Sequence, residues 1–280
     1  MKTFTLSAIA VLFTLNVLAQ VPQISKDVLR NQEPKTAPLV GEKPNYELRP
    51  VMENQSQHNT ARTTSEAQIG ITTYDLMTNG SMLEHIVRHE NGTMSTAWTF
   101  STVNNWSTRG TGYNFFNGTT WGTAPTAQLE SVRTGWPTIG ATAGGKEIVI
   151  AHDNTSIETR MTSRSSVGSG SWTQAGQGST LASDWWHKFV VGGPEGNTIH
   201  LIGITQIDAF SGTPYNGLDG ALLYARSTDQ GASWDITDLQ LPGIDSTTNI
   251  GFSPDTYTID AEGDVVAIVV CGLGTGVRLM

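Results

Sequence analysis

The sequence predicts an all-β fold built from four-stranded antiparallel sheets, on three observations. Helical signals are nearly absent, and only 15% of the residues are charged, against about 25% in an average domain, while glycine occurs 30 times. A hairpin of fixed form, a strand followed by a glycine turn and a more apolar strand, occurs four times. A second series of hairpins alternates with the first. Two hairpins per unit make a blade of about 50 residues, and blades of this size repeated around an axis form a β-propeller.

The first hairpin series is defined by turns at Gly92, Gly145, Gly196 and Gly263. Strands rich in β-branched and aromatic residues flank each glycine. The expected strand pairs are 85–88 with 94–100, 136–142 with 147–152, 187–191 with 198–204, and 257–260 with 265–270.

The second series is clearest at Ser227 to Trp234, which reads S-x-D-x-G-x-x-W. The Asp229 carboxylate is placed to accept hydrogen bonds from the backbone amides of the turn, and Gly231 permits a positive φ. Trp234 returns on the next strand, where its ring covers the turn and its N–H is expected to find an acceptor. Because the carboxylate of Asp229 is used in the turn, the four motif residues Ser227, Asp229, Gly231 and Trp234 are predicted to be structural.

Two further turns have the same form but lack the aspartate. In the segment 116–121, Phe116 stands at the aspartate position ahead of Gly118 and Trp121. In the segment 164–172, Val167 stands there. One full motif is therefore accompanied by two degenerate copies.

These turns resemble the Asp box, or BNR repeat, of the sialidase-like β-propeller superfamily. The resemblance covers residues 69–280 and implies three complete blades plus the first hairpin of a fourth, an incomplete propeller whose remaining blades are expected beyond residue 280. A β-sandwich with regularly spaced hairpins is the main alternative, and a β-helix fits less well because its repeats are shorter. Sialidases use an arginine triad, a tyrosine–glutamate pair and an aspartate, and an Arg-Ile-Pro segment commonly carries the first arginine. This chain has no such segment, so no catalytic residue is transferred to it.

The N-terminus indicates export. Residues 1–19 combine Lys2, an apolar stretch and the ending Val17-Leu18-Ala19, which is typical of a cleaved signal peptide. Residues 20–68 form a polar leader with five prolines, expected to be partly disordered. The chain is therefore predicted to be secreted or displayed at the cell surface. Its single cysteine, Cys271, excludes an intrachain disulfide and is expected to be a buried thiol.

The charge and the motifs of the sequence limit the classes of partner that the chain could bind. A net charge of −9 without a basic patch argues against nucleic acid, and no segment is long and apolar enough to span a membrane. No cofactor motif is present, and no metal is expected. Asp153 and the loop from Asp208 to Asp219 offer oxygen ligands suited to calcium, but the ordinary polarity of loops explains them equally well.

By the resemblance, the loops that join blades, and those between the second and third strands of a blade, share the face opposite the Asp-box turns. Aromatic residues, carboxylates and an arginine gather in these loops, a mixture that suits carbohydrate: rings cover the C–H face of a sugar while polar groups bind its hydroxyls. The candidate ligand face comprises Trp106, Arg133, Trp136, Asp184, Trp185, Trp186, Asp208, Tyr215, Asp219 and Asp255. In the alternative interpretation, Trp136 and Trp186 simply pack between blades.

Three functions follow from these patterns. The first is a non-catalytic module that binds extracellular glycan or protein. The second is the N-terminal part of a sialidase-like exo-glycoside hydrolase, for which a pair of carboxylates would supply acid and base. The third is a structural repeat in a larger surface protein. Since no spacing singles out a carboxylate pair, the first is preferred.

Overall fold

The fold is known from a computed structural model, which describes residues 66–74, 76, 84–153, 155, 158–176, 184–272 and 276–279. Residues 64–280 form one compact unit. The predicted signal peptide and nearly all of the polar leader lie outside the described residues.

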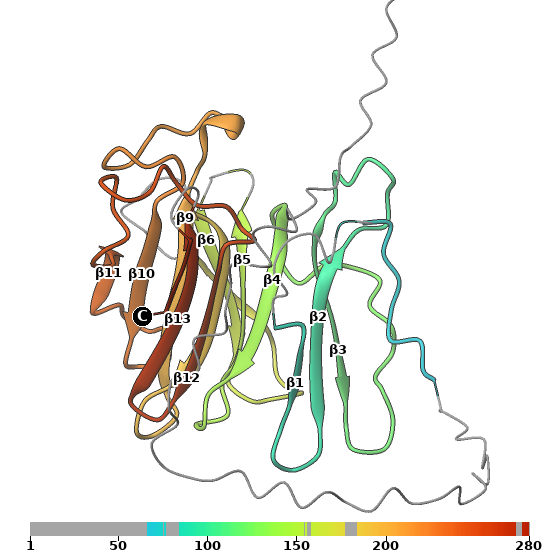
Figure 1. The fold of residues 1–280 in the computed structure, drawn as a ribbon. Helices are drawn as coiled ribbons and strands as arrows, with labels where there is room; N and C mark the ends of the chain where they lie inside the picture. Colours follow the sequence, from blue (N-terminus) through green and yellow to red (C-terminus); the bar gives the residue numbers. More distant parts are fainter. Residues whose placement is uncertain are drawn as a thin grey trace, which may run out of the picture. The chain divides into compact units, whose positions relative to one another are not determined.

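The described chain is all-β, with fourteen strands and one short 3₁₀ helix (Figure 1). The strands form four antiparallel sheets of three or four strands. The first sheet contains β1 (Ile86–Arg88), β2 (Met94–Phe100) and β3 (Gly110–Phe116). The second contains β4 (Thr134–Ala141), β5 (Glu147–Asp153), β6 (Glu158–Arg164) and β7 (Thr173–Gly176). The third contains β8 (Asp184–Gly192), β9 (Thr198–Thr205), β10 (Leu222–Ser227) and β11 (Ile236–Gln240). The fourth contains β12 (Tyr257–Glu262), β13 (Val265–Gly272) and β14 (Gly276–Leu279).

All four hairpins of the first predicted series are confirmed. β1 pairs with β2, β4 with β5, β8 with β9, and β12 with β13, each antiparallel. The turn glycines Gly92, Gly145, Gly196 and Gly263 all have positive φ, between 55° and 86°. Glycine adopts this conformation without the steric cost that a Cβ would add. The four turn glycines therefore predicted the positions of the four hairpins.

The strand counts of the first and last sheets differ from the prediction. The first sheet has three strands, because the segment that follows β3 runs beside it without forming a regular ladder. Gly122 N–H donates to Phe115 O and Leu129 N–H to Thr111 O, both at 2.9 Å. Glu130, which is buried, accepts the Thr111 N–H at 2.8 Å and thereby covers this sheet edge with a side chain. The fourth sheet has one strand more than its predicted hairpin, β14.

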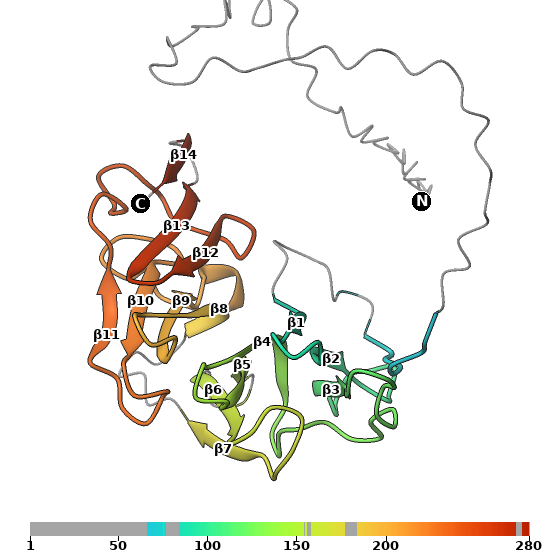
Figure 2. The same ribbon diagram turned by 90° about the horizontal axis from the view of Figure 1, so that it is seen from below.

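Consecutive sheets pack face to face in chain order (Figure 2). β4 contacts β2 on one side and β8 on the other, and β8 contacts β12. A separate apolar layer fills each junction. Ala97, Ile139 and Val149 lie between the first two sheets. Ile150, Phe189 and Leu201 belong to the layer between the second and third. The largest layer joins the third and fourth sheets and includes Trp186, Leu222 and Ile259.

The prediction for Cys271 was wrong: its thiol is exposed. Side chains alternate along β13, so that Ile268 and Val270 face the core while Val269 and Cys271 face outward. An apolar run before the cysteine could not reveal which face its side chain would take. Among the described residues, no helix has the length and apolar character needed to cross a bilayer.

Candidate functional site

Seven rings gather at one end of the second and third sheets. We call this set the aromatic cluster; it consists of Tyr74, Trp106, Trp136, His152, Trp185, Trp186 and Phe210. The antiparallel register brings them together, because the start of β4 pairs with the end of β5 and the start of β8 with the end of β9. Phe210 lies in the loop after β9, on the 3₁₀ helix η1 (Asp208–Phe210).

The backbone turns three of these tryptophans into the left-handed region. Trp106, Trp136 and Trp186 have φ values of 54°, 48° and 51°. A bulky residue rarely adopts such a φ, and positions that do so concentrate at functional sites. In β4 and in β8 the tryptophan coincides with a register shift in the ladder, a β-bulge that redirects the side chain. The same device therefore occurs at corresponding positions of two successive sheets.

His152 lies in the middle of a three-ring stack. Its imidazole is 5.3 Å from the Trp136 ring and 5.6 Å from the Trp185 ring, with interplanar angles of 26° and 20°. Trp186 meets all three rings edge-on, and Phe210 packs against Trp185 and Trp186 at 5.1 and 5.7 Å. Trp185 and Trp186 are buried, whereas Phe210 is 49% exposed.

A buried arginine holds the other side of the cluster. The Arg109 guanidinium lies 5.2 Å from the Tyr74 ring and 5.3 Å from the Trp136 ring, within cation–π range. Its Nε donates to Thr134 O at 2.9 Å, and burial lowers the pKa of this guanidinium. Arg133 Nε donates to Trp106 O at 3.1 Å and so fixes the loop that carries Trp106.

Three buried nitrogen atoms of this region have no hydrogen-bond partner among the described residues: His152 Nδ1, His187 Nδ1 and Trp185 Nε1. The other ring nitrogen of His187 bonds the Thr159 hydroxyl. Burial lowers the pKa of His187 to about 3, and burial together with the charge of Arg109 holds the pKa of His152 well below its usual range. Both imidazoles are therefore neutral at physiological pH. Unpaired buried polar groups are costly, and they are common where a ligand or water completes the bonding.

The remaining residues of the predicted ligand face lie around the same strand ends. Asp208 opens η1, and its N–H donates to the Asp219 carboxylate at 2.7 Å, so Asp219 stabilises this loop. Tyr215 is half-buried in the same loop. Asp255 lies close enough to Lys188 to favour its charged form, although burial dominates and lowers the pKa of Lys188 to about 8. Asp184 begins β8, and its side chain lies outside the described part.

Sequence reasoning missed four members of the site: Tyr74, Arg109, His152 and Phe210. His152 could have been found, because it follows an apolar strand and faces the predicted Trp136 hairpin. The other three come from irregular segments in which no periodicity indicates direction. The described residues contain no group of three or more His, Cys, Asp or Glu side chains that could hold a metal ion.

The opposite ends of the strands carry the turn at Asp229 and the two turns of similar form, and most hydrogen-bond acceptors there have partners. Asp229 Oδ2 accepts the Ser233 hydroxyl at 2.5 Å, and its Oδ1 accepts the Ser233 N–H and the Ser227 hydroxyl, both at 2.8 Å. These bonds, the one from the Ser233 hydroxyl foremost, lower the pKa of Asp229 to about 2. Gly231 has φ 82° and donates its N–H to Ser227. The Trp234 ring packs against the apolar layer as expected, but its Nε1 is buried without a partner among the described residues.

In the two turns that lack the aspartate, another side chain supplies the hydrogen-bond acceptor. At the first, Asn117 rather than residue 116 supplies it, since Asn117 Oδ1 accepts the N–H groups of Thr119 and Thr120 at 2.9 Å each. At the second, the fully buried Glu147 of β5 accepts the Gly168 N–H at 3.2 Å. Glu147 also forms an ion pair with the buried Arg164 at 2.6 Å. The motif thus changes its residues while keeping a carbonyl or carboxylate oxygen in the turn.

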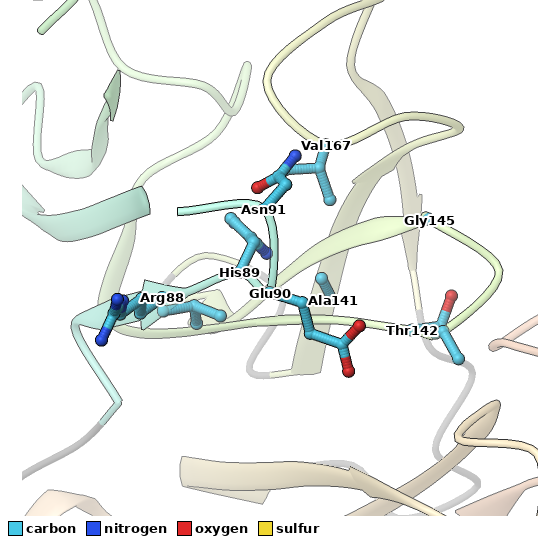
Figure 3. A pocket seen from close by; sticks show the side chains of 10 residues that line it. Arg88, His89, Glu90, Asn91, Ala141, Thr142, Gly145 and Val167 are labelled. Carbon is cyan, nitrogen blue, oxygen red and sulfur yellow. The ribbon is translucent and has the colours of Figure 1, made fainter. Parts of the chain in front are cut away.

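A cavity of about 560 Å³ opens among these turns (Figure 3). Arg88, His89, Glu90 and Asn91 of the β1–β2 turn line one side, and the β4–β5 turn and Val167 line the other. His89 Nε2 bonds the Ser95 hydroxyl at 2.9 Å, which in turn donates to Glu147. The side chains behind the cavity belong to the buried Glu147 network.

Comparison with known proteins adds little to this description. No family model matches, and no curated protein is similar. A crystal structure of a protein of unknown function from Dyadobacter fermentans DSM 18053 is similar, with a TM-score of 0.44 and 12% identity. The similarity covers 69% of this chain and 50% of that one, so this chain spans about half of the other protein's length. That protein has no known function, and none is transferred from it.

Proposed function

We propose that this chain is a secreted β-propeller module of the Asp-box type that binds an extracellular glycan at the aromatic cluster without catalysing a reaction. The observation that carries the proposal is the repeated left-handed tryptophan. Trp136 and Trp186 occupy matching bulges and converge on one strand end. Backbone strain at bulky residues costs about 1–3 kcal/mol per residue, and surrounding structure rarely maintains it without a role.

The accessible part of the cluster suits a sugar. Phe210 presents an exposed ring, and Trp106 and Trp136 are half-buried. Asp208 shares η1 with Phe210 and bonds Asp219, and the Arg133 guanidinium contacts the backbone of Trp106. Aromatic surface flanked by a few fixed polar groups is the usual composition of a small-ligand site. The buried tryptophans Trp185 and Trp186 would support the exposed ring rather than contact the ligand.

The hydrolase alternative receives less support. Asp153, the carboxylate next to His152, is fully buried and paired with Arg160 at 2.7 Å. Asp219 accepts a loop amide. A glycosidase needs two carboxylates aimed at one bond, and the carboxylates with assigned bonds here hold the backbone and a neighbouring arginine.

The test is a glycan array with a fluorogenic glycoside panel, using the full chain, Phe210→Ala and a matched control. Leu239→Ala is the control, because Leu239 is 43% exposed and lies on the edge strand β11. We expect the wild-type chain and Leu239→Ala to retain the same glycans, and Phe210→Ala to lose about tenfold in affinity, near 1.4 kcal/mol. Turnover of any glycoside would establish the hydrolase alternative. Retention of no glycan would overturn the proposal and leave a protein partner or a structural role.

A further inference from the structure

A second pocket lies at the edge of the first sheet, away from the aromatic cluster. It has a volume of about 330 Å³ and opens between the end of β3, the turn that follows it, and the degenerate Asp-box turn at Gly168. Small-molecule sites occupy about 300–1,000 Å³, so the volume is at the lower end of that range. We propose that this pocket binds one neutral pyranose residue, as a site separate from the aromatic cluster.

The lining contains no charged side chain. Three rings and four amide or hydroxyl side chains form it, together with two glycines: Tyr113, Phe115, Trp121, Asn114, Asn117, Thr120, Thr123, Gly122 and Gly168. Arg164, whose guanidinium lies over the Tyr113 ring, is buried and paired with Glu147. An anionic ligand would find no counter-charge here, whereas a neutral ligand with both C–H and O–H groups matches every lining group.

The rings are held in place before any ligand arrives. The Tyr113 hydroxyl donates to Glu147 at 3.1 Å, and the Trp172 ring packs edge-on against Tyr113 at 5.1 Å. The Trp121 ring is 5.4 Å from Phe116. Such fixed, half-buried rings offer apolar surface at little entropic cost on binding.

Hydrogen-bonding capacity remains at the rim. Asn117 Oδ1 accepts two backbone N–H groups, which fixes the amide orientation, and its NH₂ donates to the Thr120 hydroxyl at 3.4 Å. An amide NH₂ has two donors, so one remains for a ligand hydroxyl. By contrast, both donors of Asn114 are used, on Ile69 O and Gly122 O, and its Oδ1 accepts the Phe115 N–H. Asn114 therefore frames the pocket, and Asn117 is the ligand-facing amide.

Two glycines keep the pocket open. A Cβ at Gly168, where φ is 72°, would lie 2.4 Å from the Phe115 ring. A Cβ at Gly122 would lie 2.9 Å from Asn114 Oδ1.

The experiment is saturation-transfer NMR on the full chain with free glucose, galactose, mannose, N-acetylglucosamine and N-acetylgalactosamine as probes. We expect at least one sugar to show transfer, with a Kd of about 1 mM, typical of a single small contact site. Trp121→Ala should reduce the transfer at least fivefold by removing ring surface. Thr123→Arg should do the same by filling the opening, and because Thr123 is exposed it leaves the core intact.

Phe210→Ala is the control that separates this site from the proposed function. It should leave monosaccharide transfer unchanged, and Trp121→Ala should leave array binding unchanged. The proposal is overturned if no probe sugar shows transfer, if Thr123→Arg retains full transfer, or if Phe210→Ala abolishes it. Each result is independent of whether the aromatic cluster retains a glycan on an array.

Discussion

The two ends of the same strands differ in the number of buried polar groups that lack a hydrogen-bond partner. At the turn end, the buried Glu147 has an ion-pair partner and several hydrogen bonds, the exposed Asp229 accepts turn donors, and Trp234 Nε1 alone of the Asp229 turn is buried without a partner among the described residues. At the loop end, three tryptophans have left-handed backbones, and three nitrogen atoms are buried without partners among the described residues. The difference indicates that the turn end is built for stability. The loop end accepts strain and unpaired groups, which is typical of a region selected for binding.

The largest expected effect is at the turn end. Glu147→Gln should lower the free energy of unfolding by about 3–5 kcal/mol, because it leaves the buried Arg164 without a counter-charge. The measurement is urea denaturation followed by circular dichroism. Asp235→Asn removes a matched but solvent-exposed pair with Arg226 and should leave the midpoint unchanged. Equal midpoints for the two variants would show that the Glu147 network is not a source of stability.

The next effect is a pH dependence from the loop end. The folded-state pKa values of His152 and His187 lie below the unfolded value of 6.5, so below pH 6.5 the unfolded state binds more protons than the folded state. Stability should therefore fall as pH decreases from about 6.5 toward 3, by up to about 1.4 kcal/mol per pH unit for each histidine. Above pH 7 neither histidine contributes to the dependence of the free energy of unfolding on pH.

Urea midpoints between pH 7 and 4.5 measure this slope, and His187→Gln should reduce it. His89→Gln is the comparison: burial also lowers the pKa of His89, but this histidine is only half-buried, so its removal should reduce the slope less. A slope that is unaltered in His187→Gln would mean that other groups carry the acid sensitivity.

The smallest effect concerns the turn at Asp229. Asp229→Ala removes the acceptor of the Ser233 and Ser227 bonds and should cost about 1 kcal/mol, since the side chain is exposed and water replaces part of the bonding. With a folded pKa of about 2 against 3.8, its contribution is complete above pH 4 and disappears as pH falls toward 2. Comparison of Asp229→Ala midpoints at pH 7 and pH 2.5 checks both statements; an equal loss at the two values would contradict them.

How far the sequence could predict this molecule depended on the range of the interactions. The hairpins at Gly92, Gly145, Gly196 and Gly263 were predicted because a glycine turn and its flanking strands are local. A fourth strand beside β3 was predicted but does not form, because the Glu130 side chain accepts the Thr111 N–H at that edge. Trp136 and Trp186 were identified as candidates, but their left-handed backbones and the stack on His152 depend on contacts between sheets. Arg109 contacts Trp136 only in the folded chain, so no sequence spacing could predict that it belongs to the site.

The central claim, that binding belongs to the loop end and stability to the turn end, is tested most directly by one paired measurement. Glycan-array retention and urea midpoint are determined for Phe210→Ala and Asp229→Ala against the wild-type chain. We expect Phe210→Ala to bind the glycans that the wild-type chain retains about tenfold more weakly, while its free energy of unfolding falls by less than about 1 kcal/mol. Asp229→Ala should have a lowered midpoint and unchanged retention. Loss of retention in Asp229→Ala with full retention in Phe210→Ala would contradict the account.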